Sequence, residues 1–388
     1  MHAPGIHRRQ RMSSALMATM LVSGLTVTMI EAGAGALTRP RAISVSPSPN
    51  VGSHDNFLSG VACPAQNLCF ATGSGTANKY DKSLVERWNG VRWTVTPTPD
   101  KGTNYNDVNA ITCASTTECF TVGAWYTGSV DRTLIERWNG ARWSIVPSPN
   151  RGSGDLLESV SCPAPKLCFA VGTWNTMPGG QTLIERWDGA KWSVVASPNV
   201  GPTSELTGIA CPTTQFCVAV GYEQNASPYR TLVEKWTGHA WTIVSSPSPS
   251  PTSDSLSRVT CVSSTFCVAV GYQYTSVYGV LIERWTGKSW VTMTGRDMGT
   301  LANYTQGISC RSVTSCIATG RWQQGVADRT LVERWNGHTW TFVRSPNVGS
   351  SDNSLNEVAF LPGPGGHFKM VGYSYNGTVD RTLIESGP

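Results

Sequence analysis

The chain has 388 residues, only 14% of them charged, and a formal net charge of +5. Outside the N-terminal segment it has no run of Lys or Arg, so a protein that binds phosphate backbones electrostatically is excluded. The length alone would favour two or three domains, but a fixed internal period predicts one repeat domain.

Residues 1–36 are typical of an export signal. Arg8, Arg9 and Arg11 precede an apolar run over residues 15–30, and small residues follow up to Ala36. A run of this length is short for a bilayer span, so we expect cleavage near Ala34 or Ala36, no membrane span afterwards and a secreted protein. A retained membrane anchor is the alternative. Cleavage would lower the formal net charge to +3.

A stretch typified by residues 132–150, RTLIERWNGARWSIVPSPN, recurs about every fifty residues. Its glutamate returns at intervals of 50, 49, 49, 49, 50 and 52 residues, which predicts seven structural units. The seven residues are Glu86, Glu136, Glu185, Glu234, Glu283, Glu333 and Glu385.

Each unit contains four strand signals, which in the second unit cover residues 108–113, 119–123, 132–138 and 142–146. Asn139-Gly140 joins the third and fourth strands by a tight turn. A two-residue turn would set Arg137 opposite Arg142, so we favour a bulged three-residue turn that sets Arg137 opposite Trp143. Proline-rich segments end the units, where pairing stops.

The two ends of the chain are complementary. Residues 42–49 read as a fourth strand without the other three, and the seventh unit stops before its fourth strand. We therefore predict an all-β, seven-bladed β-propeller whose N-terminal strand completes the last blade and closes the ring. The predicted blades cover about residues 51–97, 101–147, 151–196, 201–246, 251–294, 299–345, and 349–385 plus 42–47.

All twelve cysteines form pairs of identical spacing between the first and second strands of six units. In an exported chain this pattern predicts disulfides, and the histidines do not recur with the cysteines as a metal site would require. Unit seven carries Phe360 and Phe368 there, which predicts an apolar contact instead. The predicted disulfides join Cys63 with Cys69, Cys113 with Cys119, Cys162 with Cys168, Cys211 with Cys217, Cys261 with Cys267, and Cys310 with Cys316.

Residues present in every unit are interpreted as structural. Twelve of the fifteen tryptophans fall in two repeated columns and are expected to pack between blades. The seven glutamates are expected to form ion pairs or hydrogen bonds, since a sevenfold catalytic residue would have no chemical purpose.

Candidate binding residues occupy positions where the units differ. Aromatic residues between the second and third strands predict a rim at one end of the ring, although each could simply cover its own blade. The rim residues are Trp125, Tyr126, Trp174, Tyr222, Tyr272, Tyr274, Trp322 and Tyr373. A polar ring in the first strands is predicted near the channel mouth at Ser59, Asn109, Glu158, Thr207, Ser257, Gln306 and Asn356. Its side chains could instead only line a water-filled axis.

The repeated LIERWNG, Cys-x5-Cys and Ala-Val-Gly elements resemble secreted bacterial propeller repeats, distantly like kelch and Asp-box propellers. The resemblance covers residues 42–385 and implies blades without any particular chemistry. Trp138-Asn139-Gly140 departs from the Asp-box spacing, so no sialidase activity carries over. We find no catalytic motif and expect no metal or cofactor.

The pattern favours a monomeric, disulfide-stabilised binding module for an extracellular glycan or protein. One alternative is a glycan-active hydrolase or lyase centred on Glu158, the only carboxylate of the polar ring. A structural protein of the cell envelope is the other. The two screens that separate them are ligand binding and glycan turnover.

Overall fold

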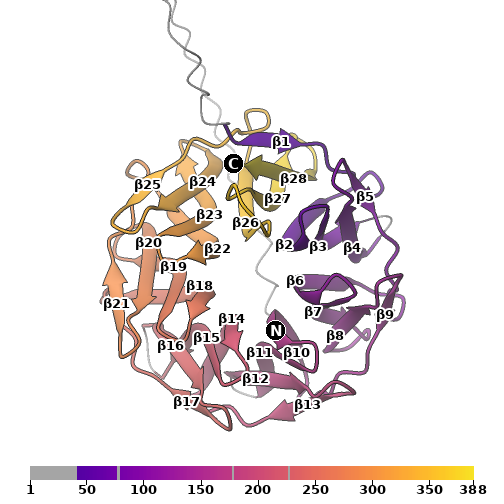
Figure 1. Cartoon of the computed structure of the whole chain (residues 1–388), viewed down its shortest axis with the longest axis vertical. Coiled ribbons are helices and arrows are strands. Elements are labelled where there is room, and N and C mark those ends of the chain that lie inside the picture. The colour runs from indigo at the N-terminus through magenta and orange to yellow at the C-terminus, as the bar shows by residue number, and fades with distance from the viewer. Residues whose placement is uncertain (1–41, 77–78, 177–178, 226–227) are drawn as a thin grey trace, which may run out of the picture. The chain divides into compact units, whose positions relative to one another are not determined.

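A computed structural model describes residues 42–388, apart from positions 77–78, 177–178 and 226–227. Every regular element in these ranges is a β-strand, and the strands form seven four-stranded antiparallel sheets around a channel (Figure 1). The predicted seven-bladed β-propeller is therefore confirmed. The proposed export signal, residues 1–36, lies outside the described residues. Within the described ranges no helix has the length and apolar character of a membrane span.

Strand order within each blade follows the chain from the channel outward, except that the outermost strand of the last blade comes from the N-terminal side (Figure 1). Blades 1 to 3 contain β2 (Asn56–Ala65), β3 (Leu68–Thr76), β4 (Asp81–Trp88) and β5 (Trp93–Val95); β6 (Asn106–Ser115), β7 (Glu118–Tyr126), β8 (Asp131–Trp138) and β9 (Trp143–Ile145); and β10 (Asp155–Ala164), β11 (Leu167–Thr176), β12 (Gly179–Trp187) and β13 (Trp192–Val195). Blades 4 and 5 contain β14 (Thr203–Thr213), β15 (Phe216–Gln224), β16 (Arg230–Trp236) and β17 (Trp241–Ile243); and β18 (Ser253–Ser263), β19 (Phe266–Tyr274), β20 (Tyr278–Trp285) and β21 (Trp290–Met293). Blades 6 and 7 contain β22 (Asn303–Ser312), β23 (Ser315–Gln324), β24 (Ala327–Trp335) and β25 (Trp340–Phe342); and β26 (Asn353–Phe360), β27 (Phe368–Tyr375), β28 (Asp380–Gly387) and β1 (Ser44–Ser46).

Ring closure occurs in blade 7, as predicted. Strand β1 pairs antiparallel with β28, with Ser44 opposite Ser386 and Ser46 opposite Ile384. Ile43, just before β1, is buried in the core of this blade. The pairing covers the outer edge of β28, which would otherwise be open to association with another chain.

The turn between the third and fourth strands differs from the prediction. It contains four residues, so Trp138 faces Trp143 and Arg137 faces Ser144. The Asn139 side chain accepts hydrogen bonds from the N–H groups of Ala141 and Arg142, both at 3.0 Å, and thereby closes the longer turn. The guanidinium of Arg137 accordingly lies 5.6 Å from the ring of Trp187 in the next blade rather than over Trp143.

Aromatic side chains pack between neighbouring blades. Phe120 of blade 2 lies 5.2 Å from Trp187 and 5.3 Å from Trp192 of blade 3, measured between ring centroids. Phe70 and Phe169 make the same pair of contacts with the tryptophans of the following blade. The predicted role of the repeated tryptophans is confirmed at these interfaces.

All six predicted disulfides are present, with Cα atoms 4.0 to 4.1 Å apart in each pair. They join Cys63 to Cys69, Cys113 to Cys119, Cys162 to Cys168, Cys211 to Cys217, Cys261 to Cys267, and Cys310 to Cys316. Each small disulfide loop restricts the unfolded chain by about 2 kcal/mol in the chain-entropy account. Six such bonds indicate an oxidising environment.

The two cysteines of each pair differ in their surroundings, which the sequence alone does not predict. The first is half-buried near the end of the first strand, whereas the second is fully buried in the second strand. Each second cysteine faces the first tryptophan of the hairpin on the neighbouring third strand, so it belongs to the blade core and cannot contact a ligand. These fully buried residues are Cys69, Cys119, Cys168, Cys217, Cys267 and Cys316.

Blade 7 replaces the disulfide with an aromatic contact, as the sequence predicts. Phe360 and Phe368 face each other across the two strands with ring centroids 5.8 Å apart. An apolar pair at the position of the covalent bond supports a structural role for the disulfides in the other six blades.

The repeated glutamates fasten each blade to the linker that arrives from the blade before it. All seven side chains are fully buried and accept a hydrogen bond from this linker. In the order of the glutamates given above, the donors are Ser48, Thr98, Ser148, Ser197, Ser246, the backbone N–H of Arg296, and Ser345. Burial raises the pKa of Glu185 to about 8, and the other six are raised to about 7 or 8 for the same reason. Their role is thus structural.

Candidate binding site at the channel mouth

The two ends of the ring differ in what they present. One end, here called the hairpin face, carries the disulfide loops and the four-residue turns. The other, here called the linker face, carries the interblade linkers and the connections between second and third strands. Because every innermost strand begins at the linker face, its first residues surround the channel mouth.

The predicted polar ring lies at a β-bulge that interrupts the innermost strand of every blade. Four of its members donate a hydrogen bond to a backbone carbonyl of the next blade. These bonds are Ser59 to Val108 at 2.6 Å, Asn109 to Leu157 at 3.0 Å, Thr207 to Leu256 at 2.7 Å and Asn356 to Leu58 at 2.7 Å. Gln306 accepts a bond from Ser354 at 2.8 Å, and Ser257 is half-buried at its own bulge. Most of this ring therefore ties the blades together.

Glu158 is the exception in this ring. Its carboxyl is half-buried and has no hydrogen-bond partner among the described residues. Burial raises its pKa to about 7, repulsion from Glu205 and Asp107 adds to the shift, and the positive charge of Arg258 opposes it. A carboxyl in this state can exchange a proton near neutral pH.

Two further carboxyls extend Glu158 into an acidic arc on blades 2 to 4. Tyr222 donates a 2.5 Å hydrogen bond to Glu205, whose pKa is raised by burial. Ser74 donates a 2.8 Å bond to Asp107, and burial raises the pKa of that group to about 6. Asp107 and Glu205 hold corresponding places in β6 and β14, two residues before the bulge. The arc consists of Asp107, Glu158 and Glu205.

Deeper in the channel the space narrows. An ion pair between Arg258 of blade 5 and Glu357 of blade 7, 3.2 Å apart, reaches across blade 6. Arg258 also donates a 2.6 Å bond to the carbonyl of Thr207. The cavity here measures about 130 Å³, which holds a few waters and no side chain of a ligand. A ligand therefore has access to the mouth and not to the full length of the channel.

Tyrosines of blades 4 to 6 form a continuous aromatic surface next to the acidic arc. Tyr278 lies 4.8 Å from Tyr274 and 5.0 Å from Tyr304, and Tyr272 lies 5.5 Å from Tyr278. Tyr222 and Tyr229 pair at 5.2 Å. Burial raises the pKa of Tyr222, and the charges of Glu205, Tyr272 and Tyr229 raise it further, which places the two groups of rings beside each other. The tyrosine patch consists of Tyr222, Tyr229, Tyr272, Tyr274, Tyr278 and Tyr304.

Two members of the patch are open to solvent. The exposed fraction is 41% for Tyr229 and 36% for Tyr278, while the other four are half-buried beneath them. Arg321 lies 4.7 Å from the ring of Tyr304 and ends the patch on blade 6. Six rings held in place by one another offer a partner a rigid surface with hydroxyl groups at its edge.

The predicted tryptophans do not belong to this surface. Trp125, Trp174 and Trp322 lie in strands β7, β11 and β23 rather than in the following loops, because these strands extend further than the alternation predicts. Lys101 lies 4.7 Å from the ring of Trp125 and Arg151 lies 4.8 Å from the ring of Trp174. All three indoles are half-buried against their own linkers or interfaces. For them the alternative interpretation, that each ring covers its own blade, fits better.

The remaining predicted tyrosines are divided between other blades, and they too lie in second strands. Tyr126 stacks on Tyr105 with ring centroids 4.9 Å apart, and Tyr105 donates a 2.9 Å hydrogen bond to Asp131. Tyr373 is half-buried in β27 of blade 7, outside the patch. Of the eight predicted aromatic residues, Tyr222, Tyr272 and Tyr274 thus lie together.

Sequence reasoning missed Asp107, Glu205 and Tyr304. All three belong to one column of the repeat, two positions before the bulge residue. This column is Phe57, Asp107, Leu156, Glu205, Ser255, Tyr304 and Ser354. Such chemical variety inside a regular repeat is a signal that would have identified the channel mouth.

The arrangement at the mouth is suited to recognition. Ring faces, phenol hydroxyls and carboxyl oxygens surround a shallow opening, and no group of three or more potential ligand side chains in the described ranges is placed to hold a metal ion. This combination attracts groups that are cationic or rich in hydroxyls.

No protein-family model and no curated protein matches the chain. Two solved structures share its fold. One, described as YCF48 bound to D1 peptide, aligns with a TM-score of 0.54 at 11% identity, over 91% of this chain and 97% of the other. The second, YCF48 from Cyanidioschyzon merolae, aligns with a TM-score of 0.55 at 12% identity, over 90% of this chain and 99% of the other. At these identities the likeness establishes a shared seven-bladed propeller fold.

Proposed function

We propose that this protein is a secreted binding module that holds a polypeptide segment of a partner against the tyrosine patch. The patch itself is the observation that supports this most. Tyrosine contributes large, rigid contact area at small conformational cost and is enriched where proteins recognise one another. Tyr229 and Tyr278 offer that area directly to solvent.

The neighbouring charges indicate which segment would fit. The acidic arc adjoins the patch through the bond from Tyr222 to Glu205. A Lys or Arg side chain could lie on the phenol rings and reach these carboxyls. The YCF48 structure described as bound to D1 peptide supports a polypeptide ligand for a ring of this shape.

The test is a peptide array followed by solution titration of the selected peptides against wild type and the double variant Tyr229→Ala/Tyr278→Ala. We expect the double variant to weaken binding at least about tenfold. Tyr375→Ala is a matched control, because Tyr375 occupies in β27 the place that Tyr274 occupies in β19, on a blade without the patch. Equal binding by the wild type and the double variant would remove the patch from the site.

A parallel polysaccharide pull-down separates protein from glycan ligands. Binding in that screen alone, lost in the double variant, would keep the site and replace the polypeptide with a glycan. Fractionation of producing cells and N-terminal sequencing of the mature chain test secretion; retention of residues 1–36 in the membrane fraction would contradict it.

A glycan-active enzyme is the second candidate, and one observation favours it. Glu158, with a pKa of about 7, faces Glu205, which supplies the second carboxyl that glycoside hydrolysis requires. Glu158→Gln should abolish turnover in a glycan-degradation screen while leaving peptide binding intact. Turnover that survives this change would remove Glu158 from any catalytic role.

A further inference from the structure

The seam where blade 7 meets blade 1 departs from the other six interfaces. On the second strand of blades 1 to 6, one position that contacts the next blade is always apolar: Phe70, Phe120, Phe169, Val218, Val268 and Ile317. Blade 7 has Lys369 there. Opposite this position the other blades carry Arg or Lys, whereas blade 7 carries Ser386. A large apolar or cationic pair is thus replaced by Lys and Ser.

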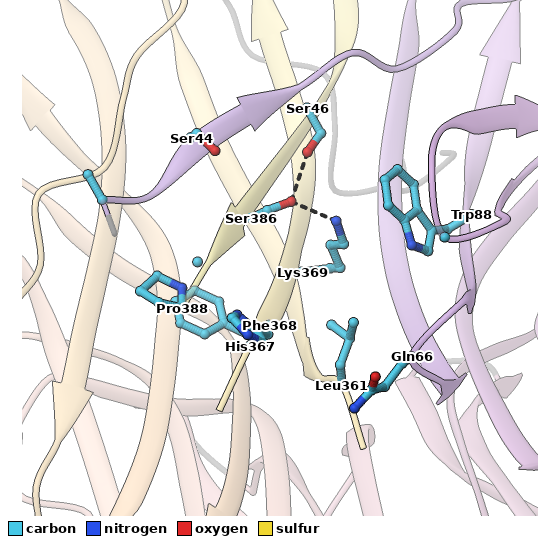
Figure 2. A pocket seen from close by; sticks show the side chains of 13 residues that line it. Ser44, Ser46, Gln66, Trp88, Leu361, His367, Phe368, Lys369, Ser386 and Pro388 are labelled. Carbon is cyan, nitrogen blue, oxygen red and sulfur yellow. Dashed lines mark hydrogen bonds between the residues drawn. The ribbon is translucent and has the colours of Figure 1, made fainter. Parts of the chain in front are cut away.

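A second replacement enlarges the space. Gly387 stands where each other blade has the first tryptophan of its hairpin, and the ring of Phe368 turns into that place. The side chains removed leave a pocket of about 470 Å³ near the outer end of the seam. Its wall includes Ser44, Ser46, Trp88, Leu361 and Lys369 (Figure 2).

Lys369 brings a positive charge into this pocket. Only 7% of the residue is exposed, and burial lowers the pKa of its ammonium group. The ammonium donates a 2.8 Å hydrogen bond to Ser386, which in turn lies 2.8 Å from the hydroxyl of Ser46, and it sits 4.0 Å from the centre of the Trp88 ring (Figure 2). Among the described residues no carboxylate forms an ion pair with it.

The absence of a counter-ion matters because a buried charge is stable only when it is paired or well solvated. One hydrogen bond and one aromatic face leave two of the three ammonium donors of Lys369 unused. Arg137, at the blade 2 interface, shows the usual solution, since Glu118 pairs with it at 2.7 Å. An anion in the seam pocket would do the same for Lys369.

We propose that the seam pocket binds a small organic anion whose carboxylate or phosphate head is held by Lys369 and the hydroxyls of Ser386 and Ser46. The indole of Trp88 and the side chain of Leu361 line the space for a planar apolar body. This site is separate from the tyrosine patch, which lies on blades 4 to 6.

Calorimetric titration with benzoate and with phenyl phosphate tests the proposal, and the better of the two identifies the head group. We expect at least one to bind in the millimolar range or tighter, and the neutral analogue benzamide to bind at least about tenfold more weakly. Failure of both anions to bind, or equal binding of benzamide, would overturn the proposal.

Variants locate the binding. Lys369→Met should abolish anion binding, whereas Lys235→Met should not change it, because Lys235 is a half-buried cation 5.8 Å from the Trp285 ring at an interface without this pocket. If Lys369→Met does not fold, Ser46→Ala/Ser386→Ala keeps the cation and removes both hydroxyls, and should weaken binding about tenfold. Unchanged affinity in the folded variants would assign the anion to another place and refute the site.

Discussion

Replacing one buried glutamate by glutamine should make the protein less sensitive to alkaline pH. In Glu185→Gln the amide oxygen can still accept the bond from Ser148, which lies 2.9 Å from the carboxyl in the wild type, and the ionisable group is gone. Burial raises the folded pKa of Glu185 from 4.5 to about 8. Because the folded value exceeds the unfolded one, the stabilisation is complete below pH 4.5 and is lost as pH rises towards 8.

The magnitude follows from the size of the shift. Each pKa unit corresponds to about 1.4 kcal/mol, so one glutamate should cost the wild type about 3 kcal/mol of unfolding free energy between about pH 5 and about pH 8. The variant should lack this loss at position 185. Urea denaturation followed by tryptophan fluorescence at both pH values measures the difference.

Glu118→Gln is the control for this experiment. It removes a carboxylate that is ion-paired to Arg137 at 2.7 Å, so it should bring no gain in stability at alkaline pH. A Glu185→Gln variant with the same pH dependence as the wild type would refute the assignment of Glu185 as a carboxyl that folding keeps protonated.

Three further changes test the frame. Gly307→Ala places a methyl group 2.6 Å from the Cα of the next blade's inner strand and should destabilise by about 2 kcal/mol, more than Gly60→Ala, whose nearest contacts are 3.0 to 3.1 Å; equal losses in thermal denaturation would contradict the packing at the axis. Removal of residues 42–46 should expose the edge of β28 and produce oligomers in light scattering, and a stable monomer would show that β1 is dispensable. Replacing both Cys113 and Cys119 with Ser should lower the unfolding free energy by about 2 kcal/mol without loss of the ring, which circular dichroism and denaturation can check.

The architecture was predictable because the repeat is covalent information. Seven glutamates at a fixed interval count the blades, and residues 42–49 complete a seventh unit that lacks its last strand. The disulfides follow equally well, since each pair is close in the chain and adjacent strands set the distance. Which cysteine of a pair enters the core was not predictable, because the burial of Cys119 depends on the third strand that brings Trp138 opposite it.

The channel mouth was less accessible to prediction. Asp107, Glu158 and Glu205 come from three blades about fifty residues apart, and only the ring brings them together. A bulge in every inner strand also interrupts the two-residue alternation, so counting residues does not tell which side chains reach the axis. The four-residue turns escaped prediction because a side-chain hydrogen bond to Asn139 decides their length.

The late position of one strand partner has a consequence for how the molecule is made. Ser46 and Ser386 touch although 340 residues separate them, so six blades can emerge from the ribosome before β1 has a partner. Contacts of such long sequence separation form slowly, and unpaired edges associate with other chains while they wait. Synthesis of this protein should therefore depend on a holding factor that shields the first strand until the last one arrives.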